Sequence, residues 1–317
     1  MEATEHNFTG ETAYPPKPVL VENSSNSLTR SLISLAIYAL LFFLLFDQNI
    51  AYIAALLLVL LIHEFGHFFA MKLYNYSNVK LFIIPLMGAM VSGKKQNVSQ
   101  KQMTVIVLAG PIPGLIIGYA LWIVNRSLEN DVLKLLSNTF ILLNLFNLLP
   151  IYPLDGGRFL ETLFLKNNYG IRLVFTTLSL IVLSILIILS QSYLMLIIPV
   201  LMGIELSNEI KNKKIRDYLD GEKINYHSDY PELPDRNYWL IRDCLIFSFP
   251  RKYNGVQPGV HQYSVAESIL MRHVMSVLKV NFNNDLSLAQ KILFFTLYLV
   301  FLLVIPLWIL VTLALNN

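Results

Sequence analysis

The stretch from Leu56 to Ala70 reads LLLVLLIHEFGHFFA, and it places three ionisable side chains inside an almost wholly apolar segment. These side chains are His63, Glu64 and His67. On a helix, residues four positions apart share a face, so the two imidazoles can bind one metal ion. Glu64 lies next to them along the helix, where its carboxylate can reach a water molecule beside that ion.

This H-E-x-x-H spacing is typical of zinc peptidases, in which it supplies two metal ligands and a general base. Two plainer interpretations compete with it: a chance match, or a hydrogen-bonded histidine in an ordinary core. The segment from Ile50 to Tyr74 is, however, close to the roughly twenty apolar residues that a bilayer span needs. Ionisable groups at membrane depth are costly and are functional by default. The sequence therefore predicts a metal site within a membrane span.

Composition supports a membrane protein. The 317 residues are 55% hydrophobic and only 14% charged, whereas a typical soluble domain is about 25% charged. We predict an all-α polytopic membrane protein of about seven transmembrane helices. The net charge of +3 is small and suits membrane topology better than nucleic acid, so no nucleic-acid partner is expected. The single Cys244 excludes an intrachain disulfide framework and a cysteine-cluster zinc site.

The apolar runs divide the chain into a membrane core and polar flanks. Residues 1–27 predict a flexible tail, residues 207–285 a small cytoplasmic soluble region, and residues 286–317 a C-terminal transmembrane helix. Within the core, residues 28–206, we expect spans at about 28–46, 50–74, 103–124, 132–149, 173–189 and 193–206.

The last two of these core spans come from one apolar region, Leu173 to Leu206. As a single straight helix it would measure about 51 Å, against a hydrocarbon core of about 30 Å. Ser190, Gln191 and Ser192 interrupt it, which favours two spans.

Lysine and arginine residues gather in alternate loops, and the positive-inside rule then places the N-terminus in the cytoplasm. With one span over 173–206, the basic region after residue 207 would face outward, against the rule. The same count places the metal site toward the cytoplasmic side of the membrane.

The segment Val79–Ser92 is apolar but is broken by Pro85 and Gly88, which predicts a small membrane-associated β-hairpin rather than a helix. Two roles remain open for it. It can plug the membrane surface, or it can offer an edge strand to an unwound substrate by β-augmentation.

A second polar group stands where a later apolar helix must break. Pro150 and Pro153 stop or distort the helix, and Asp155 follows just before two glycines. A carboxylate in such a setting needs a partner, and a metal ion would be one. We therefore predict Asp155 as the third metal ligand, with a helix cap at the membrane surface as the alternative.

Gly110, Gly114 and Gly118 are spaced by four residues and form a face that lets helices approach closely. We interpret this face as generic helix packing and expect the helix that carries His63 and His67 as its neighbour.

Together these motifs resemble the site-2 protease family of intramembrane zinc metalloproteases. The resemblance covers about residues 50–165 and rests on His63-Glu64-Phe65-Gly66-His67, Ala109-Gly110-Pro111, Asn147-x-x-Pro150 and Leu154-Asp155-Gly156-Gly157. It implies that His63, His67 and Asp155 bind one Zn²⁺ and that Glu64 activates water. It also implies that Asn147 and Pro150 lie near bound substrate. The chain departs from the family in having Tyr152 where a second proline is common, with Pro153 following it.

The expected function is zinc-dependent hydrolysis of a peptide bond in or near a transmembrane segment of another membrane protein, in regulated intramembrane proteolysis. The expected partners are this substrate and the lipid bilayer, and residues 207–285 could serve a regulatory partner or a second copy. Two alternatives are a membrane zinc peptidase that acts on surface or lipidated peptides, and a non-catalytic scaffold or transporter that retains a metal site. The presence of Glu64 argues against the second, because a structural site needs no base.

Overall fold

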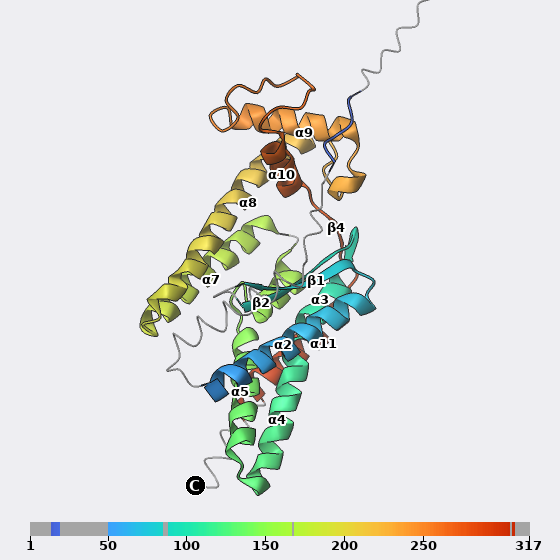
Figure 1. Cartoon of the computed structure of the whole chain (residues 1–317). Helices are drawn as coiled ribbons and strands as arrows, with labels where there is room; N and C mark the ends of the chain where they lie inside the picture. The colour runs from blue at the N-terminus through green and yellow to red at the C-terminus, as the bar shows by residue number, and fades with distance from the viewer. Residues whose placement is uncertain (1–13, 20–49, 85–87, 167, 305, 308–317) are drawn as a thin grey trace, which may run out of the picture. The chain divides into compact units, whose positions relative to one another are not determined.

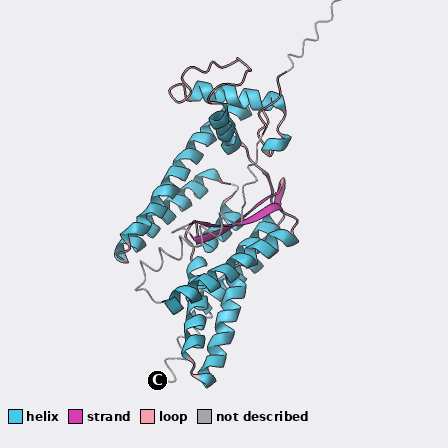
Figure 2. Cartoon of the chain, viewed as in Figure 1, coloured by secondary structure: helices cyan, strands magenta, loops and turns pink. Residues whose placement is uncertain are grey.

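The computed structural model describes residues 14–19, 50–84, 88–166, 168–304 and 306–307 (Figure 1). These residues are mostly helical, with two small two-stranded sheets (Figure 2). The chain divides into two compact units. The smaller unit comprises Met1–Asn23 and Ser207–Asn281, and the larger unit comprises Ser24–Leu206 and Phe282–Asn317.

The larger unit is built from helices joined by short connections. In chain order they are α2 (Ile50–Leu73), α3 (Gln100–Leu108), α4 (Pro111–Leu128), α5 (Asp131–Asn147), α6 (Asp155–Leu160), the π-helical turn η1 (Glu161–Leu165), α7 (Tyr169–Leu189), the 3₁₀ turn η2 (Tyr193–Leu196), α8 (Ile197–Gly221), α11 (Leu288–Leu299) and the π-helical turn η4 (Val300–Val304). Helix α8 continues from the larger unit into residues of the smaller one.

Local chemistry explains several helix ends. Asn130 caps α5, since its side chain accepts hydrogen bonds from the first backbone N–H groups. Ser287 and Gln290 form a reciprocal capping box at the start of α11. The span predicted over 103–124 lies within the candidate span Gln100–Leu128 but consists of two helices, because Pro111 cannot donate the backbone hydrogen bond that would continue α3.

Four stretches of the described residues are long and apolar enough to cross a membrane. They are Ile50–Leu73, Gln100–Leu128, Tyr169–Leu189 and Tyr193–Gly221. The last two confirm the predicted break at 190–192, where α7 ends and η2 begins. Helix α5 has 17 residues, and the apolar helix Leu288–Leu303 is also shorter than the four. The span expected at 28–46 lies outside the described residues, as does the end of the C-terminal span.

Helix α7 shows the surface expected of a membrane helix. Val174, Leu178 and Ile185 are 58%, 56% and 50% exposed. A contiguous apolar face of this kind is rare on a soluble monomer. Lipid is the environment that suits it.

The predicted hairpin is present. Strand β1 (Ser77–Ile84) pairs antiparallel with β2 (Gly88–Lys94), with Leu81 opposite Val91 and an irregularity between Ser77 and Lys80. The tip, residues 85–87, lies outside the described residues. A second small sheet joins β3 (Asn97–Ser99) to β4 (Asn281–Asn283).

The core of the larger unit lies between α3, α4, α5, α6 and α11. Helix α4 packs along α5, and α2 packs against both and against the hairpin. Tyr298 of α11 donates a hydrogen bond to the Leu148 carbonyl at 2.7 Å, which anchors the break after α5. The buried apolar residues are Val107, Leu108, Leu115, Leu148, Phe159, Leu163, Leu286 and Tyr298.

The smaller unit has its own aromatic core around the end of α8, the 3₁₀ turn η3 (Tyr230–Glu232), α9 (Asp235–Ser248) and α10 (Glu267–Val277). Its buried residues include Tyr238, Trp239, Leu245, Leu270 and Val274. Residues 14–19, which fall within the predicted tail, lie against this core. Helix α10 begins at Glu267 with Ala266 as N-cap; Ser264 lies before the helix, and its backbone N–H and hydroxyl both donate to the Glu267 carboxylate.

Candidate metal centre

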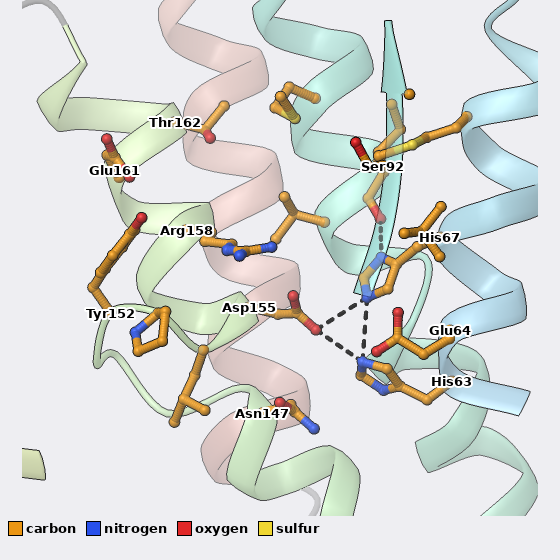
Figure 3. Close-up of a pocket in the computed structure, with 18 of the residues that line it drawn as sticks. His63, Glu64, His67, Ser92, Asn147, Tyr152, Asp155, Arg158, Glu161 and Thr162 are labelled. Atoms are coloured by element: carbon orange, nitrogen blue, oxygen red, sulfur yellow. Dashed lines mark hydrogen bonds and ion pairs between the residues drawn. The ribbon is translucent and has the colours of Figure 1, made fainter. Parts of the chain in front are cut away.

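Helix α2 presents His63 and His67 on one buried face, as the four-residue spacing predicts. The two residues are 2% and 8% exposed. Their Nε2 atoms lie 3.2 Å apart, and the rings meet edge to face. Figure 3 shows both rings turned toward the same point.

Asp155 arrives at that point from the first turn of α6. Its Oδ2 atom lies 3.0 Å from His63 Nε2 and 3.2 Å from His67 Nε2 (Figure 3). The N-cap of α6 is Leu154, so the Asp155 carboxylate does not act as the helix cap that was the alternative. His63, His67 and Asp155 are a group of buried side chains whose ligand atoms converge closely enough to hold a metal ion.

The hydrogen bonds made by the Nδ1 atoms of His63 and His67 determine the tautomer of each imidazole, and so which nitrogen is free to bind a metal. His67 Nδ1 lies 2.7 Å from the Ile106 carbonyl oxygen, which can only accept, so Nδ1 carries the proton. His63 Nδ1 lies 2.8 Å from Asn144 Oδ1 and donates in the same way. In neutral imidazoles the Nε2 atoms then carry lone pairs.

Two Nε2 lone pairs and a carboxylate oxygen therefore point at one another across 3.0–3.2 Å. Such a set repels itself unless a cation lies among its members. Zinc bonds of about 2.0–2.2 Å in a tetrahedral arrangement separate ligand atoms by about 3.3 Å. The donor set of two imidazoles and one carboxylate fits Zn²⁺ in both type and spacing.

Two glycines permit this close packing. A Cβ atom on Gly66 would lie 2.0 Å from the Ala109 carbonyl oxygen, and one on Gly110 would lie 2.4 Å from His67 Nε2. Helix α2 can therefore approach the α3–α4 junction only with glycine at both positions.

We predicted that the glycine face would pack against the helix that carries His63 and His67, which is α2. Only Gly110 does so. Gly114 and Gly118 face α5, where added Cβ atoms would meet Asn144 at 2.3 Å and Phe140 at 2.9 Å. Gly110 therefore does more than permit helix packing, because it leaves room for the His67 imidazole.

Glu64 is 6% exposed and lines the same cavity as the three ligands. Figure 3 shows its carboxylate beside the two imidazoles. The cavity has a volume of about 450 Å³. Its other lining residues come from the hairpin, α3, and the segment from the end of α5 to η1; they include Val91, Ser92, Gly93, Ile106, Asn147, Tyr152, Pro153, Arg158, Glu161 and Lys166.

The two residues expected near substrate differ in position. Asn147 lines the cavity, and its Nδ2 atom donates to the Leu143 carbonyl of its own helix at 3.1 Å. Pro150 is exposed. Tyr152 and Pro153, which follow it, line the cavity.

Sequence reasoning missed the groups that orient the two histidines. Asn144 is fully buried, and its Nδ2 atom also donates to the Phe140 carbonyl at 2.7 Å. An amide side chain inside an apolar helix is a signal that could have indicated it. The Ile106 carbonyl leaves no signal in the sequence, because any residue supplies a backbone oxygen.

Residues 51–130 match the family model described as peptidase family M50. A zinc metalloprotease of Methanocaldococcus jannaschii is 31% identical over 138 residues, which are 42% of this chain and 36% of that protein. Stage IV sporulation protein FB of Bacillus subtilis is 31% identical over 118 residues, which are 35% of this chain and 39% of that protein.

A solved structure described as a site-2 protease from M. jannaschii aligns at a TM-score of 0.42 with 22% identity, and the alignment covers 56% of this chain and 87% of that one. The sequence alignments span little more than a third of the length of either relative. The family match, over residues 51–130, includes the H-E-x-x-H motif, and in this part the chain is similar to peptidase family M50.

Proposed function

We propose that this protein is a zinc-dependent intramembrane endopeptidase that hydrolyses a peptide bond in or near a transmembrane segment of another membrane protein. One observation carries the proposal: the buried triangle of His63, His67 and Asp155 lies on and beside α2, a helix long and apolar enough to span a membrane. The family supports this reaction class.

His63, His67 and Asp155 would hold one Zn²⁺. When bound, the ion supplies Lewis-acid chemistry and lowers the pKa of a water molecule in its open position. Three protein ligands are typical of a catalytic zinc site, whereas structural sites are closed by four. Asn144 and the Ile106 carbonyl hold the imidazoles in the tautomer that a metal needs.

Glu64 is the general base in this proposal. Its carboxylate takes a proton from the attacking water and then delivers it to the nitrogen of the leaving amine. The burial of Glu64 at the cavity wall suits this transfer, because bulk water does not compete for the proton.

A substrate helix hides its peptide bonds in its own hydrogen bonds, so it must be unwound before cleavage. Strand β2 contributes Val91, Ser92 and Gly93 to the cavity. Among the described residues β2 pairs only with β1, which leaves one edge to receive an extended substrate segment. We infer that Asn147 helps to hold that segment and that Pro150 shapes the approach to the cavity.

We further infer seven spans, with the N-terminus and the metal centre toward the cytoplasm. This topology adds residues 28–46, α5 and the C-terminal helix to the four candidate spans, and it follows from the distribution of lysine and arginine. Arg158, Glu161 and Lys166 line the cavity and offer a polar path for water. A role in regulated intramembrane proteolysis follows by analogy with the family.

The test compares membranes from cells that express the wild type, Glu64→Gln or Glu129→Gln. Glu129 is an exposed residue at the end of α4 and serves as the matched control. We expect Glu64→Gln to keep one zinc per chain, to lose cleavage by at least about 10²-fold, and to accumulate uncleaved single-span proteins in quantitative proteomics. Cleavage by Glu64→Gln at the rate of Glu129→Gln would contradict the proposal.

A further inference from the structure

The smaller unit contains a second candidate site, in which its side chains bind an extended segment of the chain. Residues 14–19, Tyr-Pro-Pro-Lys-Pro-Val, form what we name the proline segment. Each proline fixes its own φ near −65°, and each residue before a proline is restricted to extended conformations. The segment is therefore stiff and extended before it binds anything, and its carbonyl groups have no partners within it.

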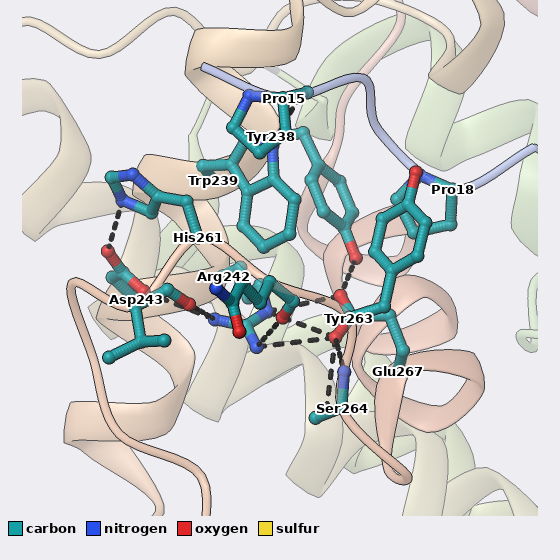
Figure 4. Close-up of polar contacts among 12 residues, drawn as sticks. Pro15, Pro18, Tyr238, Trp239, Arg242, Asp243, His261, Tyr263, Ser264 and Glu267 are labelled. Atoms are coloured by element: carbon teal, nitrogen blue, oxygen red, sulfur yellow. Dashed lines mark hydrogen bonds and ion pairs between the residues drawn. The ribbon is translucent and has the colours of Figure 1, made fainter. Parts of the chain in front are cut away.

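Three aromatic side chains donate hydrogen bonds to carbonyl oxygens of the proline segment. Trp239 Nε1 bonds to Pro15 O at 2.6 Å, Tyr263 Oη to Pro16 O at 2.8 Å, and Tyr230 Oη to Pro18 O at 2.7 Å. Figure 4 shows Pro15 over the Trp239 ring. These bonds use the backbone of the segment, so any segment of similar shape can make them.

Lys17 adds the one charge-dependent contact. Its backbone N–H donates to Asp235 Oδ1 at 2.9 Å, and its ammonium donates to the Pro231 carbonyl at 3.0 Å and to the Leu233 carbonyl. The ammonium also lies 5.5 Å from the centre of the Tyr230 ring, within cation–π range. The site therefore favours a basic residue among the prolines.

The aromatic residues are held in place by groups beneath them. The Trp239 and Tyr263 rings stack at 6.1 Å with an angle of 12°. The buried Arg242 donates to the carbonyl oxygens of Val260 and Gln262, which fixes the loop that carries Tyr263 (Figure 4). The site is thus built by the fold of the smaller unit rather than by the segment that occupies it.

We propose that Tyr230, Trp239, Tyr263 and Asp235 form a binding site for proline-rich polypeptide segments that carry a basic residue between prolines. Residues 14–19 are its resident ligand, and a segment of the same class from another polypeptide exchanges with them. Aromatic side chains that bind an extended proline-rich backbone are a recurring mode of peptide recognition. Because the resident segment belongs to the same chain, it binds at a high effective concentration and competes with any external segment.

The test uses the full-length chain in detergent and a fluorescent peptide with the sequence of residues 10–20. An open variant carries Pro15→Ala, Pro16→Ala, Lys17→Ala and Pro18→Ala, which weakens the resident segment. We expect the peptide to bind the open variant saturably, with a dissociation constant below about 1 mM, and to bind the wild type at least about tenfold more weakly because the site is occupied. Fluorescence anisotropy measures both.

Two substitutions in the open variant separate recognition from folding. Tyr263→Phe removes the hydroxyl donor to Pro16 from an exposed side chain, so it should weaken peptide binding by about three- to tenfold without unfolding the unit. Tyr218→Phe removes the hydroxyl of another exposed tyrosine, which lines a separate hollow beside α8, and should leave binding unchanged. Circular dichroism confirms folding in each case. If the fourfold variant unfolds, Lys17→Glu serves as the milder open variant.

Absence of saturable binding to a folded open variant would overturn the proposal. Equal binding of a peptide in which the three prolines and the lysine are alanine would also overturn it. Cleavage activity is not the readout, so failure here leaves the proposed protease function intact.

Discussion

The larger and smaller units each bury a charged cluster, but the two clusters are opposite in hydrogen-bond character. At the metal centre, His63, His67 and Asp155 direct acceptor atoms at one another. In the smaller unit, the Arg242 guanidinium donates to the Glu267 carboxylate at 3.1–3.3 Å. The Arg242 guanidinium supplies the cation of the second cluster, whereas the atoms of the first are arranged as ligands for one.

This difference separates a functional group of residues from a structural one. Burial alone raises the pKa of Glu267, but hydrogen bonds from Tyr238, Ser264 and Arg242 outweigh it and lower the pKa below its ordinary value. Glu267 is therefore charged and fully partnered by protein. Polar groups that complete one another fix a structure, whereas acceptors that converge without a donor predict an ion.

Removal of Glu267 should have the largest effect on stability. Glu267→Ala leaves the buried Arg242 with only the longer 3.5 Å ion pair to Asp243 Oδ1, and breaking a buried pair costs about 3–5 kcal/mol. We expect the thermal unfolding of the smaller unit to shift strongly, while zinc content stays at one per chain. Glu222→Ala, at an exposed position, is the control. If zinc were lost together with the unit's stability, the two clusters would not be independent.

Removal of Asn144 should have an intermediate effect, confined to the metal. Asn144→Leu deprives His63 Nδ1 of its acceptor, and loss of such a partner typically weakens metal binding about 10- to 100-fold. Competition with a zinc chelator measures the change. Asn147→Leu is the matched control, since its Nδ2 atom bonds to its own helix, and it should leave zinc affinity unchanged. Equal affinities in the two variants would show that Asn144 does not orient the ligand.

A smaller effect is expected from acid acting on the smaller unit. Burial, with Lys252 nearby, lowers the pKa of His273 to about 4 from 6.5, and its Nδ1 lies 2.6 Å from the Tyr253 hydroxyl. Between these values the unfolded chain binds more protons than the folded one. The stability that the neutral His273 contributes is therefore full above pH 6.5 and falls as the pH drops toward 4. Because the His273 side chain is partly exposed, the loss is modest.

Thermal unfolding at pH 7.5, 6 and 5 measures this dependence. We expect His273→Gln to flatten it and His227→Gln, at an exposed position, to leave it as in the wild type. An unchanged pH dependence in His273→Gln would remove His273 as its source.

The sequence predicted the features that follow from periodicity and chain breaks. The spacing of His63 and His67 placed two ligands on one helix face, and Pro150 with Pro153 predicted the break in the helix that precedes Asp155. The hairpin and the break at 190–192 followed from Pro85, Gly88 and three polar residues. Each of these features depends on residues close together in the sequence, so it can be predicted from a single sequence.

Long-range partners could not be predicted in the same way. The contact of Asn144 with His63 joins residues 81 positions apart, and the Ile106 oxygen is a backbone atom. The proline segment looked like a polar tail, because its aromatic partners lie more than 200 residues later in the chain. Only the fold reveals such pairs.

The most direct test of the metal centre is zinc X-ray absorption on the purified full-length protein, combined with metal analysis. We predict one zinc per chain, two imidazole ligands, at least one oxygen ligand at about 2.0–2.2 Å and no sulfur. Asp155→Asn should lose most of its zinc under the same conditions. A wild-type spectrum and full zinc content in Asp155→Asn would contradict the assignment of His63, His67 and Asp155 as the ligand set.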